Sequence, residues 1–307
     1  MKNNNKILSD KLPVYTLRLT QILKQLIIFL FFTLIVVYTS CSSAPKNRGD
    51  IDTLRSQGET WLETGNKQAG LGAFENALSI LTETKRNAIL ADDSSLIIRV
   101  CLSRGNVLFS LARTDEAFAE WDHAVAEAQR LGNAELLSVS RIYHARGNLI
   151  TQRQNAQSVL SEVTTLSTHI TNARYTAFSW QVRGLALRAM GSYSEAESAM
   201  RRSLDINERG SYLESASYDW YTIASIRSLA GNFSGAISAL ESSIAIDRRI
   251  ENSWGLAASY RASGDVHRRA GRSDEAAEAY ARARMIYAAM GNDHETAEID
   301  RRTNNNE

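Results

Sequence analysis

Residues 51–290 alternate between amphipathic stretches of helix length and short polar or glycine-containing turns. Aligning the chain on a small residue midway through an apolar helix brings six positions into register, with separations of 47, 42, 37, 40 and 40 residues. A repeat of this length predicts an array of helical hairpins stacked on one another. The six positions are Gly58, Gly105, Gly147, Gly184, Ala224 and Gly264.

The same pattern of residue sizes follows each of these positions. Twelve residues on, most units have a small residue, and sixteen on they have a large apolar one, so we expect two helices to approach closely at the small residues. A glycine seven residues on is expected to end the first helix in a left-handed conformation, at Gly65, Gly191, Gly231 and Gly271. The small residues are Gly70, Ala117, Ala196, Ala236 and Ala276, the large ones are Phe74, Trp121, Met200, Leu240 and Tyr280, and the degenerate third unit has Val159, Val163 and Leu166.

The pattern predicts an all-α domain over residues 51–290. The only prolines are Pro13 and Pro45, so no proline interrupts a helix in this range. A single hairpin cannot bury its own apolar face, so stability is expected to come from stacked neighbours. Residues 291–307 are polar and predict a capping helix over 293–302, followed by a disordered tail.

The N-terminal segment has a different character. Residues 26–38 form an apolar run of 13 residues, shorter than the ~20 residues of an ordinary membrane span. The run follows a lysine-containing leader and ends in Thr39 and Ser40, just before Cys41. This layout predicts a secretory signal peptide over residues 1–40, followed by a polar tether over 41–50.

The segment Tyr38-Thr39-Ser40-Cys41 resembles a bacterial lipobox. The resemblance implies cleavage before Cys41 and lipidation (palmitate) of its thiol, which anchors a protein without a spanning helix. An uncleaved N-terminal anchor with a free Cys41 is the alternative. Either arrangement predicts a location in the bacterial cell envelope, periplasmic or surface-exposed, attached to a membrane.

The repeats resemble those of the tetratricopeptide family, of the longer type, near 40 residues, found in kinesin light chains. The resemblance implies a right-handed α-α superhelix of about six hairpins that binds proteins or peptides. The clearest stretches are LARTDEAFAEWDHAVAEA (111–128), AMGSYSEAESAMRRSLDI (189–206), LAGNFSGAISALESSIAID (229–247) and RAGRSDEAAEAYARARMIY (269–287).

In this family the first helix of each hairpin lines a groove that holds the ligand. Carried over residue by residue, the resemblance implies a partner-binding groove on this chain, with the asparagines at 106 and 148 as candidates to hold a peptide backbone through their amide groups. The alternative is that both asparagines are ordinary exposed helix residues. The groove residues implied are Arg99, Asn106, Arg141, His144, Asn148, Arg188, Tyr218, Tyr221, Arg261, Asp265 and Arg268.

Charge and composition exclude several classes of function. The chain has a formal net charge of +1, and residues 41–307 hold 30 basic and 33 acidic side chains. That balance lacks the basic surface that nucleic acids require. Two cysteines and five dispersed histidines predict no zinc site, and a lipidated Cys41 leaves Cys101 without a disulfide partner.

The sequence contains no phosphate-binding loop, zinc-protease motif or nucleophile elbow. We therefore expect no catalytic residues and no cofactor. Beyond Lys85 every basic residue is arginine, which favours either an acidic or phosphorylated partner or ordinary solvated helix faces. The expected function is a membrane-anchored scaffold for a protein or peptide; the alternatives are a transporter-accessory or small-ligand-binding lipoprotein and a surface adhesin.

Overall fold

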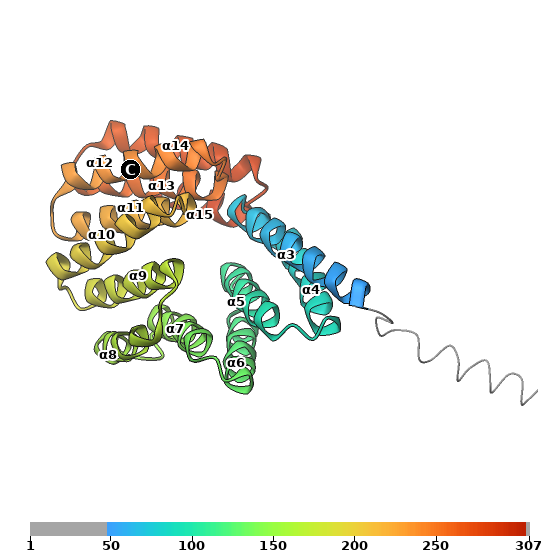
Figure 1. The fold of residues 1–307 in the computed structure, drawn as a ribbon. Coiled ribbons are helices and arrows are strands. Elements are labelled where there is room, and N and C mark those ends of the chain that lie inside the picture. The colour runs from blue at the N-terminus through green and yellow to red at the C-terminus, as the bar shows by residue number, and fades with distance from the viewer. Residues whose placement is uncertain (1–47, 305–307) are drawn as a thin grey trace, which may run out of the picture. The chain divides into compact units, whose positions relative to one another are not determined.

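The computed structural model of the protein describes residues 48–304 (Figure 1). The predicted signal peptide, Cys41, most of the tether and the last three residues of the tail lie outside the described residues. Within residues 48–304 the structure has thirteen α-helices, one short 3₁₀ helix (η1) and no β-strand, which confirms the all-α class. The helices are α3 (Arg48–Gly70), α4 (Phe74–Leu90), α5 (Ser94–Ser110), α6 (Thr114–Leu131), α7 (Ala134–Ile150), α8 (Ala156–Leu166), η1 (Ser167–His169), α9 (Ala173–Ala189), α10 (Tyr193–Arg209), α11 (Leu213–Leu229), α12 (Phe233–Arg249), α13 (Ser253–Arg269), α14 (Ser273–Ala289) and α15 (Asp293–Asn304).

The helices form six successive hairpins, followed by α15. From α4 to α15, each helix packs chiefly on the helices before and after it in the chain. We call the first helix of each hairpin the A helix (α3, α5, α7, α9, α11 and α13) and the second the B helix (α4, α6, α8, α10, α12 and α14). A helices also contact the next A helix, as α5, α7 and α9 do, and this closeness is expected of the inner wall of a superhelical array. Residues 53–304 of the array belong to one compact unit.

The turns inside the hairpins have a left-handed residue two positions after the A helix. Gly191, Gly231 and Gly271 have φ of +78°, +83° and +73°, as predicted. The same prediction for Gly65 is wrong, because that residue lies inside α3, where a Cβ would meet the Leu81 side chain at 2.7 Å. Gly72, with φ of +78°, takes the turn position of the first hairpin.

The structure also corrects the register of two repeats. Gly105, Gly184, Ala224 and Gly264 all lie five residues before the end of their A helices. The matching positions in the first and third hairpins are Gly65 and Ala145, rather than Gly58 and Gly147. The A helices end at residues 70, 110, 150, 189, 229 and 269, so their true period is 39 or 40 residues throughout.

An insertion in the third hairpin explains the error there. The turn between α7 and α8 spans residues 151–155, two residues longer than the three-residue turns of the other hairpins. The B helix is therefore displaced by two residues relative to its A helix, and Val159 and Val163 are buried at the positions expected from the B-helix pattern. The shorter α8 and η1 then restore the period before α9.

Close contact between small and large side chains holds the hairpins together, as the pattern predicts. A Cβ on Gly105 would lie 2.2 Å from Nε1 of Trp121, and one on Gly264 would lie 2.6 Å from the Tyr280 ring. Both aromatic side chains are almost completely buried. Only glycine allows the A helix to approach the B helix this closely at these two positions.

The first hairpin also contacts the sixth. The rings of Phe74, at the start of α4, and Trp254, in the first turn of α13, meet edge-on with centroids 4.9 Å apart. Trp254 in turn packs against Tyr287 of α14 at 5.5 Å. None of the helices within residues 48–304 is long and apolar enough to cross a membrane.

Candidate functional site

Eight of the predicted groove residues share one face of the A helices. Each is the sixth, ninth, thirteenth or sixteenth residue of its helix, and steps of three and four residues keep side chains on one side of an α-helix. We call this surface the A-helix face. Its predicted members are Arg99 and Asn106 of α5, Arg188 of α9, Tyr218 and Tyr221 of α11, and Arg261, Asp265 and Arg268 of α13.

Polar contacts join neighbouring A helices across this face. Arg99 donates to Glu59 of α3 at 2.7 Å, and Arg188 donates to the Ser225 hydroxyl of α11 at 3.2 Å. Glu59 was not among the predicted residues, although it lies eleven residues before the end of α3, as Arg99 lies eleven residues before the end of α5. Such contacts fix the positions of successive helices relative to one another. A surface that is ordered in advance loses less entropy when it binds a ligand.

The last two A helices carry the densest group of predicted residues. The rings of Tyr218 and Tyr221 stack with centroids 6.5 Å apart, and both side chains are half-buried. Arg261 forms an ion pair with Glu295 of α15. Asp265 accepts hydrogen bonds from the Tyr280 hydroxyl at 2.7 Å and from Arg302 of α15 at 2.8 Å.

Arg268 is the most accessible charged member of this group. Its guanidinium lies 3.5 Å from the Asp265 carboxylate, and its side chain remains about two-fifths exposed. Tyrosine and arginine, present here on two adjacent A helices, are residue types enriched where proteins bind one another. We call Tyr218, Tyr221, Arg261, Asp265 and Arg268 the α11–α13 patch.

Arg141, His144 and Asn148 lie on a different side of their helix. They are the eighth, eleventh and fifteenth residues of α7, because the sequence register was displaced by two residues in this hairpin. Nε2 of His144 lies 3.3 Å from Asp122 of the preceding B helix, and the Asn148 amide lies 3.2 Å from Nδ1 of His144. Arg141 is exposed.

The two asparagines are therefore not structural equivalents. Asn106 is the thirteenth residue of its helix and Asn148 the fifteenth. The Oδ1 atom of Asn106 is buried and has no hydrogen-bond partner among the described residues. The amide of Asn148, by contrast, is held by His144 and by Gln154 of the inserted turn.

A fully buried carboxylate, Asp219, lies between the fourth and fifth hairpins. It accepts hydrogen bonds from Gln181 at 2.8 Å, Ser203 at 2.9 Å and Asn207 at 2.7 Å. Burial raises the pKa of Asp219 to about 7, since no cation offsets it and the three neutral donors offset only part of the desolvation. The helical pattern gave no sign of this network, because its members are polar residues at core positions.

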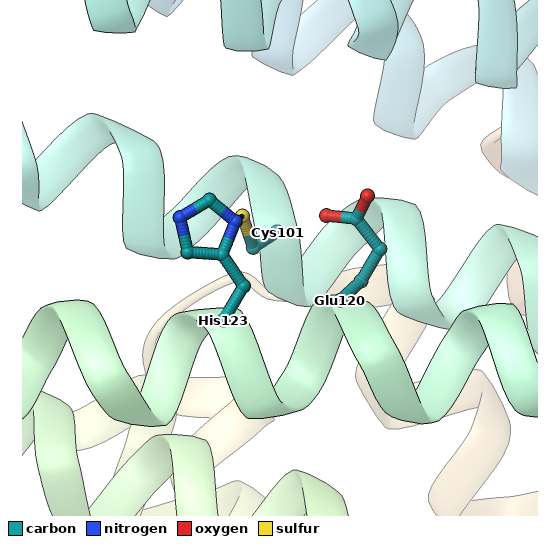
Figure 2. A group of neighbouring side chains, drawn as sticks. All are labelled: Cys101, Glu120 and His123. Carbon is teal, nitrogen blue, oxygen red and sulfur yellow. Dashed lines mark hydrogen bonds between the residues drawn. The ribbon is translucent and has the colours of Figure 1, made fainter.

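The structure brings together one group of side chains with metal-ligand chemistry, shown in Figure 2. Atoms of Cys101 on α5 and of Glu120 and His123 on α6 all lie within 4.8 Å of one another. Both Glu120 oxygens already accept from cations, from Lys85 at 2.8 Å and Arg104 at 3.1 Å. These two positive charges oppose a metal cation at the same carboxylate.

The thiol in this group is not activated. Burial raises the pKa of Cys101 to about 12, so the thiol stays protonated at neutral pH. Burial opposes ionisation of Glu120 as well, but the hydrogen bond from Lys85 and the charge of Arg104 hold the pKa of that carboxyl below its usual value. The group is consistent with an internal ion pair beside a buried thiol.

Comparisons with known proteins agree with the fold. Two family models, both described as tetratricopeptide repeat, match residues 179–209 and residues 215–289. These ranges cover most of the fourth hairpin and nearly all of the fifth and sixth. No curated protein matches the chain.

Several solved structures share the architecture at low sequence identity. PlcR of Bacillus thuringiensis, solved in complex with the peptide PapR7 and DNA, is 12% identical, with a TM-score of 0.58 over 73% of this chain and 83% of that one. A Rap protein complexed with Competence and Sporulation Factor is 14% identical, with a TM-score of 0.56 over 83% and 78%. BtubC (BKLC) from P. vanneervenii is 13% identical, with a TM-score of 0.51 over 73% and 92%. At these identities the likeness concerns the fold.

Proposed function

We propose, since this chain is a tetratricopeptide repeat protein, that it is a membrane-anchored scaffold that binds a protein or peptide partner in the bacterial cell envelope. The observation that carries the proposal is the A-helix face, where eight predicted residues from four A helices share one side of the array. Two proteins of similar fold were solved with the peptide PapR7 and with Competence and Sporulation Factor, which supports a peptide ligand here.

The proposal assigns binding rather than catalysis to this surface. The α11–α13 patch offers stacked aromatic rings and charged groups, but no histidine or cysteine lies among its members. The buried Cys101 thiol elsewhere is protonated and so is a poor nucleophile. We therefore place the partner on the α11–α13 patch, through tyrosine stacking and the Arg268 guanidinium.

Partner capture tests this assignment. We expect Tyr218→Ala with Arg268→Ala to reduce the partner recovered from detergent-solubilised membranes by about tenfold or more, since aromatic and arginine anchors dominate binding energy. Neither side chain holds another element in place: Tyr218 stacks on Tyr221 and Arg268 makes one long contact with Asp265. Arg261 is less suitable because its ion pair with Glu295 helps to hold α15.

The matched control is Arg141→Ala with Asn148→Ala, which changes predicted residues that lie off the A-helix face. The control is expected to retain the partner. Equal recovery with all three proteins, or loss of the partner only with the control, would remove the α11–α13 patch as the binding surface.

We further propose that Cys41 carries the lipid anchor. Cells expressing the wild-type chain are expected to incorporate radiolabelled palmitate into the protein, and Cys41→Ser is expected to lose the label. Cys101→Ser is the matched control, because Cys101 is the other cysteine of the chain and is buried between α5 and α6. Label that persists in Cys41→Ser would contradict the anchor. Protease treatment of intact cells distinguishes a surface-exposed from a periplasmic position.

A further inference from the structure

Two arginines of the fourth hairpin share one aromatic ring. The guanidinium carbon of Arg183 on α9 lies 3.9 Å from the ring centroid of Trp180, and that of Arg202 on α10 lies 4.6 Å from the same centroid. The two guanidinium carbons are therefore no more than about 8.5 Å apart. Two cations at this separation repel each other unless an anion lies near both.

Neither arginine forms an ion pair within residues 48–304, although most arginines of the array do. The Nε atom of Arg183 is buried and has no hydrogen-bond acceptor among these residues. Burial, and then the charge of Arg202, lower the pKa of Arg183. A buried guanidinium donor without an acceptor is unfavourable, so the site gains from any oxyanion that reaches it.

The second hairpin shows where such an oxyanion fits. Arg104 is the eleventh residue of α5, as Arg183 is of α9. Its Nε atom donates to the carboxylate of Glu120, the seventh residue of α6, at 3.1 Å. The seventh residue of α10 is the buried Ala199, so the fourth hairpin has a methyl group where the second has a carboxylate.

The fourth hairpin also adds positive charge. Arg202 is the tenth residue of α10, and the tenth residue of α6 is His123. In the sixth hairpin Tyr260 and Arg282 occupy the places of Trp180 and Arg202, but there Arg282 pairs with Glu278 at 2.8 Å. Arg104 of the second hairpin and Arg282 of the sixth thus each pair with a carboxylate of the chain. Arg183 and Arg202, at the equivalent positions of the fourth hairpin, have no such partner within residues 48–304.

We propose that Trp180, Arg183 and Arg202 form a binding site for an oxyanion, a carboxylate or phosphate group, that comes from outside the chain. The ligand oxygens take the place that the Glu120 carboxylate has beside Arg104. Guanidinium groups bind such anions through paired N–H donors, and each of the two guanidiniums lies against the indole ring. The site lies where α9 meets its own B helix rather than on the A-helix face, so it is independent of the function proposed above.

The test uses the full chain in detergent at constant ionic strength. Inorganic phosphate and, separately, a hexaglutamate peptide blocked at both ends are titrated by calorimetry. We expect saturable binding of at least one probe, and an increase in Kd of at least tenfold in the double variant Arg183→Gln/Arg202→Gln. The matched control, Arg141→Gln/Arg272→Gln, changes two exposed arginines and is expected to shift Kd by less than twofold.

A second variant adds a carboxylate of the chain itself to the site. Ala199→Glu places a carboxylate where the second hairpin has Glu120, and is expected to abolish binding of both probes while raising Tm. Helical circular dichroism checks that this variant folds; if it does not, the arginine variants decide. Binding of phosphate alone, of the peptide alone or of both supports the site and identifies the oxyanion. The site is refuted if neither probe saturates, or if the Arg183→Gln/Arg202→Gln protein binds as the wild type does.

Discussion

Trp121→Ala is expected to lower the free energy of unfolding by about 3–5 kcal/mol, the usual cost of removing a fully buried tryptophan. The Trp121 side chain has no exposed surface. It packs against Gly105 of α5 and Gly147 of α7, and its ring lies 5.2 Å from Phe118 and 5.7 Å from Phe109. Its loss opens a cavity between the second and third hairpins.

This loss is expected to reach beyond one hairpin, since each hairpin of a repeat array is stabilised mainly by its neighbours. Urea unfolding followed by circular dichroism measures the effect. Trp61→Ala is the control, because Trp61 on α3 is 37% exposed and its removal is expected to change stability by less than ~1 kcal/mol. If the two variants lose the same stability, Trp121 does not join the two hairpins as described.

The second large effect is a dependence of stability on pH that originates at Asp219. The folded chain raises the pKa of this carboxyl to about 7, from an ordinary value of 3.8. A raised acid pKa means that the folded state holds the proton more tightly than the unfolded state does. The contribution of Asp219 to stability is therefore greatest below pH ~4, falls as the pH rises towards 7, and is level above that, with a total loss of at most about 4 kcal/mol from this group.

Asp219→Asn removes the titrating group and keeps a side chain of the same shape. We expect its stability to vary much less than that of the wild type between pH 4 and pH 7.5, measured as urea midpoints at each pH. A smaller slope is expected to remain, because burial also raises the pKa of Asp247. Asp274→Asn, at an exposed position on α14, is expected to retain the wild-type profile. An unchanged profile in Asp219→Asn would mean that its three hydrogen bonds offset the burial.

Much of the array is predictable because its local rules are strong. Gly191, Gly231 and Gly271 end their helices as expected, since glycine adopts positive φ without a steric cost. The pattern of small and large residues that places Gly264 against Tyr280 is visible in the sequence for another reason: a residue without a Cβ allows the close approach of a large ring sixteen residues on. The true register was harder to recognise, because Gly58 and Gly147 are also small residues in apolar helices.

The errors have a common physical cause. A helix of 3.6 residues per turn presents several small residues to different neighbours, and composition alone does not say which neighbour each one meets. Gly147 faces Trp121 of the preceding B helix, whereas Gly105 faces the same tryptophan from its own hairpin. Because one turn has two inserted residues, the sequence alignment assigned Arg141, His144 and Asn148 to the groove, although they lie off the A-helix face.

The proposed oxyanion site could have been recognised from the sequence, because the register of the second and fourth hairpins was predicted correctly. Aligning the second hairpin on the fourth sets Arg104 beside Arg183 and Glu120 beside Ala199, which shows an arginine that has lost its carboxylate. The Asp219 network has no such signal, because its three donors come from α9 and α10 and meet only when those helices pack on α11.

The sequence by itself determined that residues 51–290 form helical hairpins, where the turns of the last three hairpins lie, and which small and large side chains meet inside these hairpins. These features depend on contacts within about 20 residues, which periodicity and glycine positions encode directly. The tertiary structure alone decided which polar side chains have partners. That property depends on helices from different hairpins, as in the pairing of Arg99 with Glu59, the burial of Asp219, and the two arginines that share Trp180 without a carboxylate.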